Sequence, residues 1–124
     1  MAPGIRIWRS WRSDFAGLIS GRPDAELTDE TLTADGVYDD AELARIADAG
    51  FNGIWVHGQL HNLVRTDPFP ELGPRFRQHQ AALRSLMDRA RRRGIAVFLY
   101  LQPPRAIPAA NRAFWDRHPE AGGQ

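Results

Sequence analysis

Cysteine and lysine are both absent from this 124-residue sequence. Without cysteine, the chain can form neither disulfides nor thiolate metal sites. Without lysine, all 16 basic residues are arginines; 15 acidic residues nearly balance them, for a formal net charge of +1. So small a charge gives no general attraction to nucleic acid or membranes, and we expect neither as a partner. The exclusive use of arginine is more typical of a codon bias than of selection for bidentate anion recognition.

Long apolar runs are also absent. None approaches the roughly 18 residues of a membrane span. The first residues lack the basic segment and apolar core of a secretory signal. We therefore expect a cytoplasmic protein. No glycine-rich dinucleotide fingerprint or phosphate loop follows an apolar segment, so nucleotide binding is disfavoured and no cofactor is expected.

Apolar residues and turn formers alternate in a way that predicts a succession of strands and helices. Strands are predicted at residues 5–11, 51–58 and 95–101, and helices at residues 40–49, 75–93 and 109–116. Long loops are predicted at residues 14–36, where a short turn of helix is also compatible with the sequence, and at residues 59–74. The end of the chain is expected to be frayed. Asp39 and Glu42 have the spacing of a capping box, which marks the start of the first helix. Gly50 and Gly94 stand where helices end in a left-handed residue.

This order predicts an α/β fold in which parallel strands are joined by right-handed crossovers. The loops that follow the strands are long and those that precede them are short, as at the working face of β/α barrels. A complete eight-fold barrel needs roughly 250 residues. We therefore expect residues 1–124 to be the N-terminal fragment of a TIM-type barrel catalytic domain, with about three β/α units.

Three segments carry a resemblance to a known family: Tyr-Asp-Asp-Ala-Glu-Leu (38–43), Ala-Gly-Phe-Asn-Gly-Ile-Trp-Val-His (49–57) and Gly-Ile-Ala-Val-Phe-Leu-Tyr-Leu (94–101). They resemble the opening of β-N-acetylhexosaminidase-like glycoside hydrolase barrels, especially bacterial relatives. The resemblance covers about residues 5–120. It implies that an arginine on the first strand holds sugar hydroxyls, with Arg9 in the matching position and Arg12 as the alternative. It also implies that the catalytic Asp-Glu pair follows the fourth strand, beyond the third and last strand predicted here.

Other candidate residues follow from their own chemistry. His57, Gln59 and His61 come at the end of the second predicted strand, where they could hydrogen-bond sugar hydroxyls or satisfy neighbouring backbone. Gln102 and Arg105 follow the third strand, in a proline-rich segment that would rigidify the loop; the guanidinium could bind vicinal hydroxyls or tie the loop to an acidic residue.

The tryptophans, the histidine pair and the arginine run at residues 91–93 each allow a structural as well as a functional interpretation. Trp11 is the better candidate for stacking on a sugar face, and Trp55 is expected in the core. The pair His57 and His61 has no fixed geometry in a loop, so a metal site is not expected. Residues 91–93, all arginines, fit the negative end of a helix dipole better than a nucleic-acid surface.

Two functions remain open at this point. The first is a fragment of a glycoside hydrolase that acts on a carbohydrate substrate but lacks the catalytic carboxylates. The alternative is a small self-contained α/β module that binds a carbohydrate or an anion without catalysis. A fragment would leave an apolar sheet edge exposed and is expected to self-associate through it.

Overall fold

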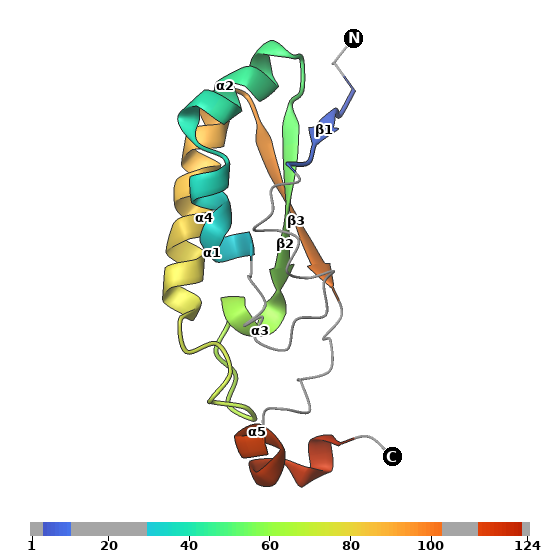
Figure 1. The fold of residues 1–124 in the computed structure, drawn as a ribbon, viewed down its shortest axis with the longest axis vertical. Helices are drawn as coiled ribbons and strands as arrows, with labels where there is room; N and C mark the ends of the chain where they lie inside the picture. The colour runs from blue at the N-terminus through green and yellow to red at the C-terminus, as the bar shows by residue number, and fades with distance from the viewer. Residues whose placement is uncertain (1–3, 11–29, 103–111, 123–124) are drawn as a thin grey trace.

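The computed structural model describes residues 4–10, 30–102 and 112–122. In these ranges the chain forms a three-stranded parallel sheet in the order β1-β2-β3, accompanied by helices (Figure 1). The strands are β1 (Ile7–Trp8), β2 (Gly53–Gln59) and β3 (Ala96–Gln102). The helices are α1 (Glu30–Val37), α2 (Asp40–Asp48), α3 (Leu60–Leu63), α4 (Phe76–Arg91) and α5 (Arg112–Arg117), followed by a 3-10 helix (Pro119–Ala121). The predicted α/β class with parallel strands is confirmed.

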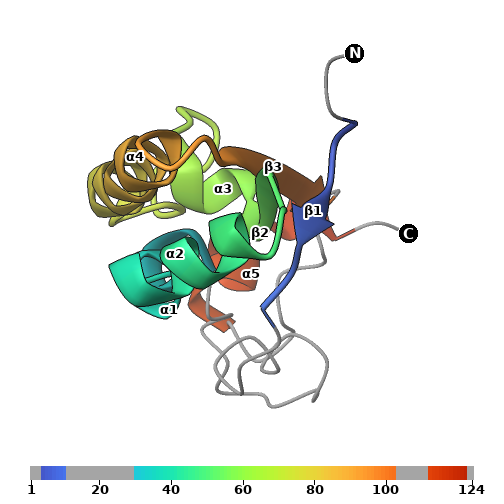
Figure 2. The ribbon, with the colours of Figure 1, turned by 90° about the horizontal axis from the view of Figure 1, so that it is seen from above.

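The hydrophobic core lies between the sheet and the helices α1, α2 and α4, which are on the same side of it (Figures 1 and 2). Ile54 and Val56 of β2 are fully buried there. They meet Leu43 and Ile46 of α2 and Leu86 of α4 in one cluster. The sheet therefore has one face that is covered by helices and one face that the described helices leave open.

The glycine and capping predictions are largely confirmed. Gly50 and Gly94 follow α2 and α4 with φ of +86° and +69°, a conformation that suits glycine because it has no Cβ. The Asp39 carboxylate accepts a hydrogen bond from the backbone N–H of Glu42 at 2.8 Å, as an N-cap does. The reciprocal half of a capping box is not made, because the Glu42 side chain pairs with Arg45 instead.

The segment at residues 14–36, predicted as a long loop with room for a short turn of helix, instead contains the eight-residue helix α1 from Glu30 onward. Threonine and glycine have low helix propensities, which made this segment resemble a loop. Contacts with α4 stabilise the helix despite these low propensities. The Thr31 hydroxyl lies 2.8 Å from Nδ1 of the buried His79 on α4, and Arg89 of α4 forms an ion pair with Asp35. Residues 14–29 lie outside the described part of the chain.

Other boundaries differ by smaller amounts. Of residues 5–10 of the strand predicted at residues 5–11, only Ile7–Trp8 form β1, and residue 11 lies outside the described ranges. The elements β2, α4 and β3 lie within one or two residues of their predictions. The predicted loop at residues 59–74 contains the single turn α3, and the end that was expected to fray contains the 3-10 helix. The helix predicted at residues 109–116 corresponds to α5, which extends one residue further, to Arg117; residues 109–111 lie outside the described ranges. No helix in the described part of the chain is long and apolar enough to cross a membrane.

Candidate functional site

The side chains of β2 alternate between the two faces of the sheet. Ile54, Val56 and Gly58 face the helices: a Cβ built on Gly58 would lie 2.8 Å from Cγ2 of Thr31 on α1. Trp55, His57 and Gln59 consequently belong to the open face, because successive residues of a strand point to opposite sides. The parallel register with β3 places them beside Phe98, Tyr100 and Gln102.

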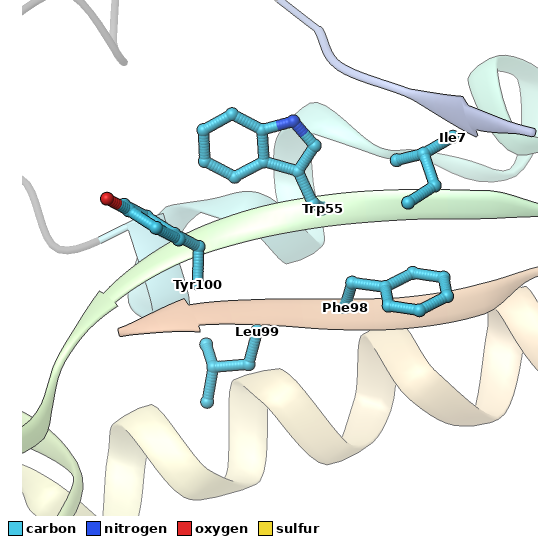
Figure 3. A pocket seen from close by; sticks show the side chains of 5 residues that line it. All are labelled: Ile7, Trp55, Phe98, Leu99 and Tyr100. Atoms are coloured by element: carbon cyan, nitrogen blue, oxygen red, sulfur yellow. The ribbon is translucent and has the colours of Figure 1, made fainter. Parts of the chain in front are cut away.

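An apolar groove runs along the open face. The side chains of Ile7, Trp55, Phe98 and Tyr100 line it from the open face, whereas that of Leu99, at the margin of the groove, points to the other side of β3 (Figure 3). The Trp55 and Tyr100 rings meet edge to face, with centroids 5.5 Å apart, and Tyr100 remains 48% exposed. The prediction that Trp55 belongs to the core is wrong, because its position in the alternation puts it on the open face rather than against the helices.

A buried ion pair lies beside this groove. Arg9, just after β1, donates from both terminal guanidinium nitrogens to the two carboxylate oxygens of Glu30 on α1. The Glu30 side chain is fully buried and that of Arg9 is 10% exposed. The guanidinium carbon of Arg9 lies 4.1 Å from the centroid of the Trp55 ring, a cation–π contact that covers one side of that ring.

The same side chains complete the hydrogen bonding of β2 where β1 has ended. Glu30 accepts the backbone N–H of His57 at 2.8 Å, and Arg9 donates to the Trp55 carbonyl at 3.4 Å. The Tyr38 hydroxyl accepts the Ser10 N–H at 2.9 Å and lies 3.5 Å from the Trp55 carbonyl. Burial raises the pKa of the Tyr38 phenol above its ordinary value of 10.0. These contacts explain why β1 is short: side chains take the place of further strand pairing.

His57 and Gln59 point to the same side of the sheet as Trp55 but, unlike Tyr100, they are buried. They are only 4% and 5% exposed. Both ring nitrogens of His57 and both amide atoms of Gln59 are buried, and none has a hydrogen-bond partner in the described part of the chain. Leaving a buried polar group unsatisfied costs about 1–3 kcal/mol, so four such atoms on neighbouring positions of one strand face need an explanation. A polar ligand that pairs with them supplies one.

Of the residues proposed from the sequence, Arg9 lies at the Trp55 carbonyl and is joined to the His57 N–H through Glu30, and Gln59 follows two residues after His57 on the same strand. Gln102 ends β3 in register with Gln59, and His61 lies in α3 directly after β2. Trp11, Arg105 and the alternative Arg12 lie outside the described residues. Groups of three or more metal-ligating side chains do not occur within the described ranges.

Sequence reasoning missed three residues of this region. Glu30 and Tyr38 were not identified, because neither lies near Arg9 or Trp55 along the chain. Tyr100 gave a usable signal: it stands two residues after Phe98 in a strand, and the two side chains therefore share a face. That Tyr100 lies opposite His57 could be known only from the register between β2 and β3. The His57 and Tyr100 rings lie 5.6 Å apart.

No family model, curated protein or solved structure matches this chain.

Proposed function

We propose that this chain forms one wall of the carbohydrate site of a glycoside hydrolase built on a β/α barrel. The observation that carries the proposal is the pair His57 and Gln59 at the carboxyl end of β2, which buries four polar atoms that have no hydrogen-bond partner among the described residues. Barrel enzymes keep their ligands at this end of the strands. The resemblance to hexosaminidase-like barrels points to the same ligand class.

The chemistry of the pair suits sugar hydroxyls. A neutral imidazole offers one donor and one acceptor, and a carboxamide offers two donors and an acceptor oxygen. A hydroxyl also donates and accepts, so vicinal hydroxyls can satisfy both side chains at once. The adjacent Tyr100 ring is nearly half exposed and provides an apolar surface for the C–H face of a pyranose.

The open face of the sheet supports the barrel part of the proposal. The open-face side chains Trp55, His57, Phe98 and Tyr100 correspond to positions that point to the inside of a barrel, where neighbouring strands would cover them. On the helix side of β3, Leu99 and Leu101 are 37% and 42% exposed, as expected if a further β/α unit packs there. The isolated chain is expected to self-associate through the edge of β3.

Catalysis by this chain alone is not part of the proposal. Among the described residues, the buried carboxylate of Glu30 contacts β2 beside the site, and it is engaged by Arg9 and by the His57 N–H. We therefore expect no turnover of aryl-glycosides by the 124-residue chain. A self-contained sugar-binding module would show the same lack of turnover; an exclusively monomeric state with cooperative unfolding would favour the module over the barrel fragment.

The proposal is tested by titrating the isotopically labelled chain with methyl pyranosides and following the His57 ring signals by NMR. We expect saturable shifts with glucoside, galactoside or N-acetylglucosaminide. Gln59→Ala should weaken the binding by about tenfold or more, since one lost hydrogen-bonding side chain is worth on the order of 1.4 kcal/mol. Gln78→Ala, at an exposed glutamine on α4, is the matched control and should bind like the wild type. Absence of binding by the wild type, or equal loss in both variants, would overturn the proposal.

A further inference from the structure

We infer that His118 is a proton-dependent latch: as an imidazolium it fastens α5 and the following 3-10 helix to the segment between α3 and α4, and as a neutral imidazole it holds them less tightly. His118 is not part of the proposed sugar site, so this inference does not rest on the proposed function. The latch joins the segments that follow β2 and β3 along the chain, and α5 lies beyond the carboxyl ends of these strands (Figure 1).

Both ring nitrogens of His118 face carboxylate oxygens. Nε2 lies 2.5 Å from Oε1 of Glu71, and Nδ1 lies 3.4 Å from Oε1 of Glu120. An ionised carboxylate only accepts hydrogen bonds, and a neutral imidazole has a single N–H to donate. The imidazolium has an N–H on each nitrogen and a positive charge between the two carboxylates. The arrangement therefore favours the protonated ring.

The ring is also held between two aromatic side chains. Its centroid lies 5.0 Å from that of Phe69, in the segment between α3 and α4, and 4.9 Å from that of the buried Phe114 on α5. The side chain of His118 is only 15% exposed. Charge pairs in such a partly buried place are screened less by solvent and salt than pairs on the open surface. The charge of His118 therefore affects how tightly the two segments pack.

The charged groups around the ring set the pH range of the latch. The pKa of the Glu71 carboxyl is lowered from its ordinary value of 4.5 by a hydrogen bond from its own backbone N–H and further by His118 and the charge of Arg117. Arg117 itself donates from Nε to the Ala113 carbonyl at 3.0 Å. Histidine ordinarily titrates near about pH 6.5. The latch should thus be strongest at about pH 5–6, and it should weaken below this range as Glu71 is protonated and above it as His118 loses its proton.

The test is amide hydrogen exchange of the isotopically labelled chain, followed by NMR at about pH 5.5 and about pH 8. The intrinsic exchange rate at each pH is divided by the measured rate, which removes the direct effect of pH on exchange. One reporter is the His118 N–H, which is bonded to the Phe114 carbonyl. The other is the Leu72 N–H, which is bonded to the Phe69 carbonyl. We expect protection of both to fall about threefold or more at the higher pH, while that of the Leu43 N–H in the core is unchanged.

Two variants separate the latch from a contact that is merely structural. His118→Gln can still donate to Glu71 but does not titrate, so protection of the Leu72 N–H should be equal at the two pH values. Glu71→Gln should lose most of the pH dependence. Asp116→Asn, at an exposed carboxylate on α5, is its matched control and should keep the pH dependence of the wild type.

The wild type alone decides the question if a variant loses protection of its α5 segment at both pH values. In the wild type, the pH midpoint of the His118 ring signals should coincide with that of the Leu72 protection. Different midpoints, unchanged protection between the two pH values, or an equal fall at Leu43 would overturn the latch. A pH dependence that persists in His118→Gln would overturn it as well.

Discussion

Replacement of Gly58 by alanine is expected to destabilise the fold by overfilling the contact between α1 and β2. The added Cβ would lie 2.8 Å from Cγ2 of Thr31 and 3.0 Å from Cδ1 of Leu99, well inside van der Waals contact. Thr31 cannot easily rotate away, because its side chain is β-branched and its hydroxyl is bonded to His79. Overpacking of this kind costs about 1–3 kcal/mol.

The assay is equilibrium denaturation in urea, with thermal unfolding as a second measurement. For a chain of this size the expected loss corresponds to a decrease in Tm of about 3–6 °C per kcal/mol. Gly36→Ala in α1 is the matched control, since a Cβ there meets nothing within 4 Å. It should stabilise the protein by up to about 1 kcal/mol, because alanine has the higher helix propensity.

A double-mutant cycle identifies the contact responsible. Thr31→Ser removes the methyl group that the new Cβ would approach, so it should recover part of the loss in the Gly58→Ala background, with a coupling of about 1 kcal/mol. If Gly58→Ala is as stable as the wild type, α1 does not pack on β2 at this distance. If the loss is unchanged by Thr31→Ser, the contact with Thr31 is not its cause.

Two further predictions concern contacts that join the helices and strands. Arg89 of α4 donates to the Tyr38 carbonyl at 2.9 Å and forms an ion pair with Asp35, so Arg89→Met should lower the free energy of unfolding in urea by about 1–3 kcal/mol. The control Arg84→Met, at an exposed position of the same helix, should change it by less than about 0.5 kcal/mol. Equal effects of the two substitutions would contradict the bridging role of Arg89. Burial raises the pKa of Tyr38, so its contribution to stability is intact below pH 10 and is lost as the pH rises towards the folded-state pKa. Tyr38→Phe should lower the free energy of unfolding at pH 7 by about 1–2 kcal/mol, since the Ser10 N–H loses its acceptor. It should also flatten the decrease in the free energy of unfolding between pH 9 and 11. The same slope in both proteins would show that another group causes this decrease.

The parts of the fold that were predictable depend on neighbours along the chain. The Asp39 N-cap and the glycines at 50 and 94 act within one helical turn, and the apolar run of β3 marks a strand wherever the sheet is formed. Helix α1 was not predictable in this way. Its threonines and glycine favour other conformations, and its stability comes from contacts with α4 and β2, which are distant in sequence.

The candidate site also has features that local sequence patterns predict and features that they do not. From the sequence, His57 was expected near the end of a strand and Gln59 in the loop that follows it. The two side chains share a strand face because β2 extends to Gln59 and the period of a strand is two. Tertiary packing put this face away from the helices, buried the two side chains without a hydrogen-bond partner among the described residues, and joined Glu30 to Arg9 across 21 positions of sequence. Burial and pairing depend on which distant segments pack together, and local patterns carry no information about that choice.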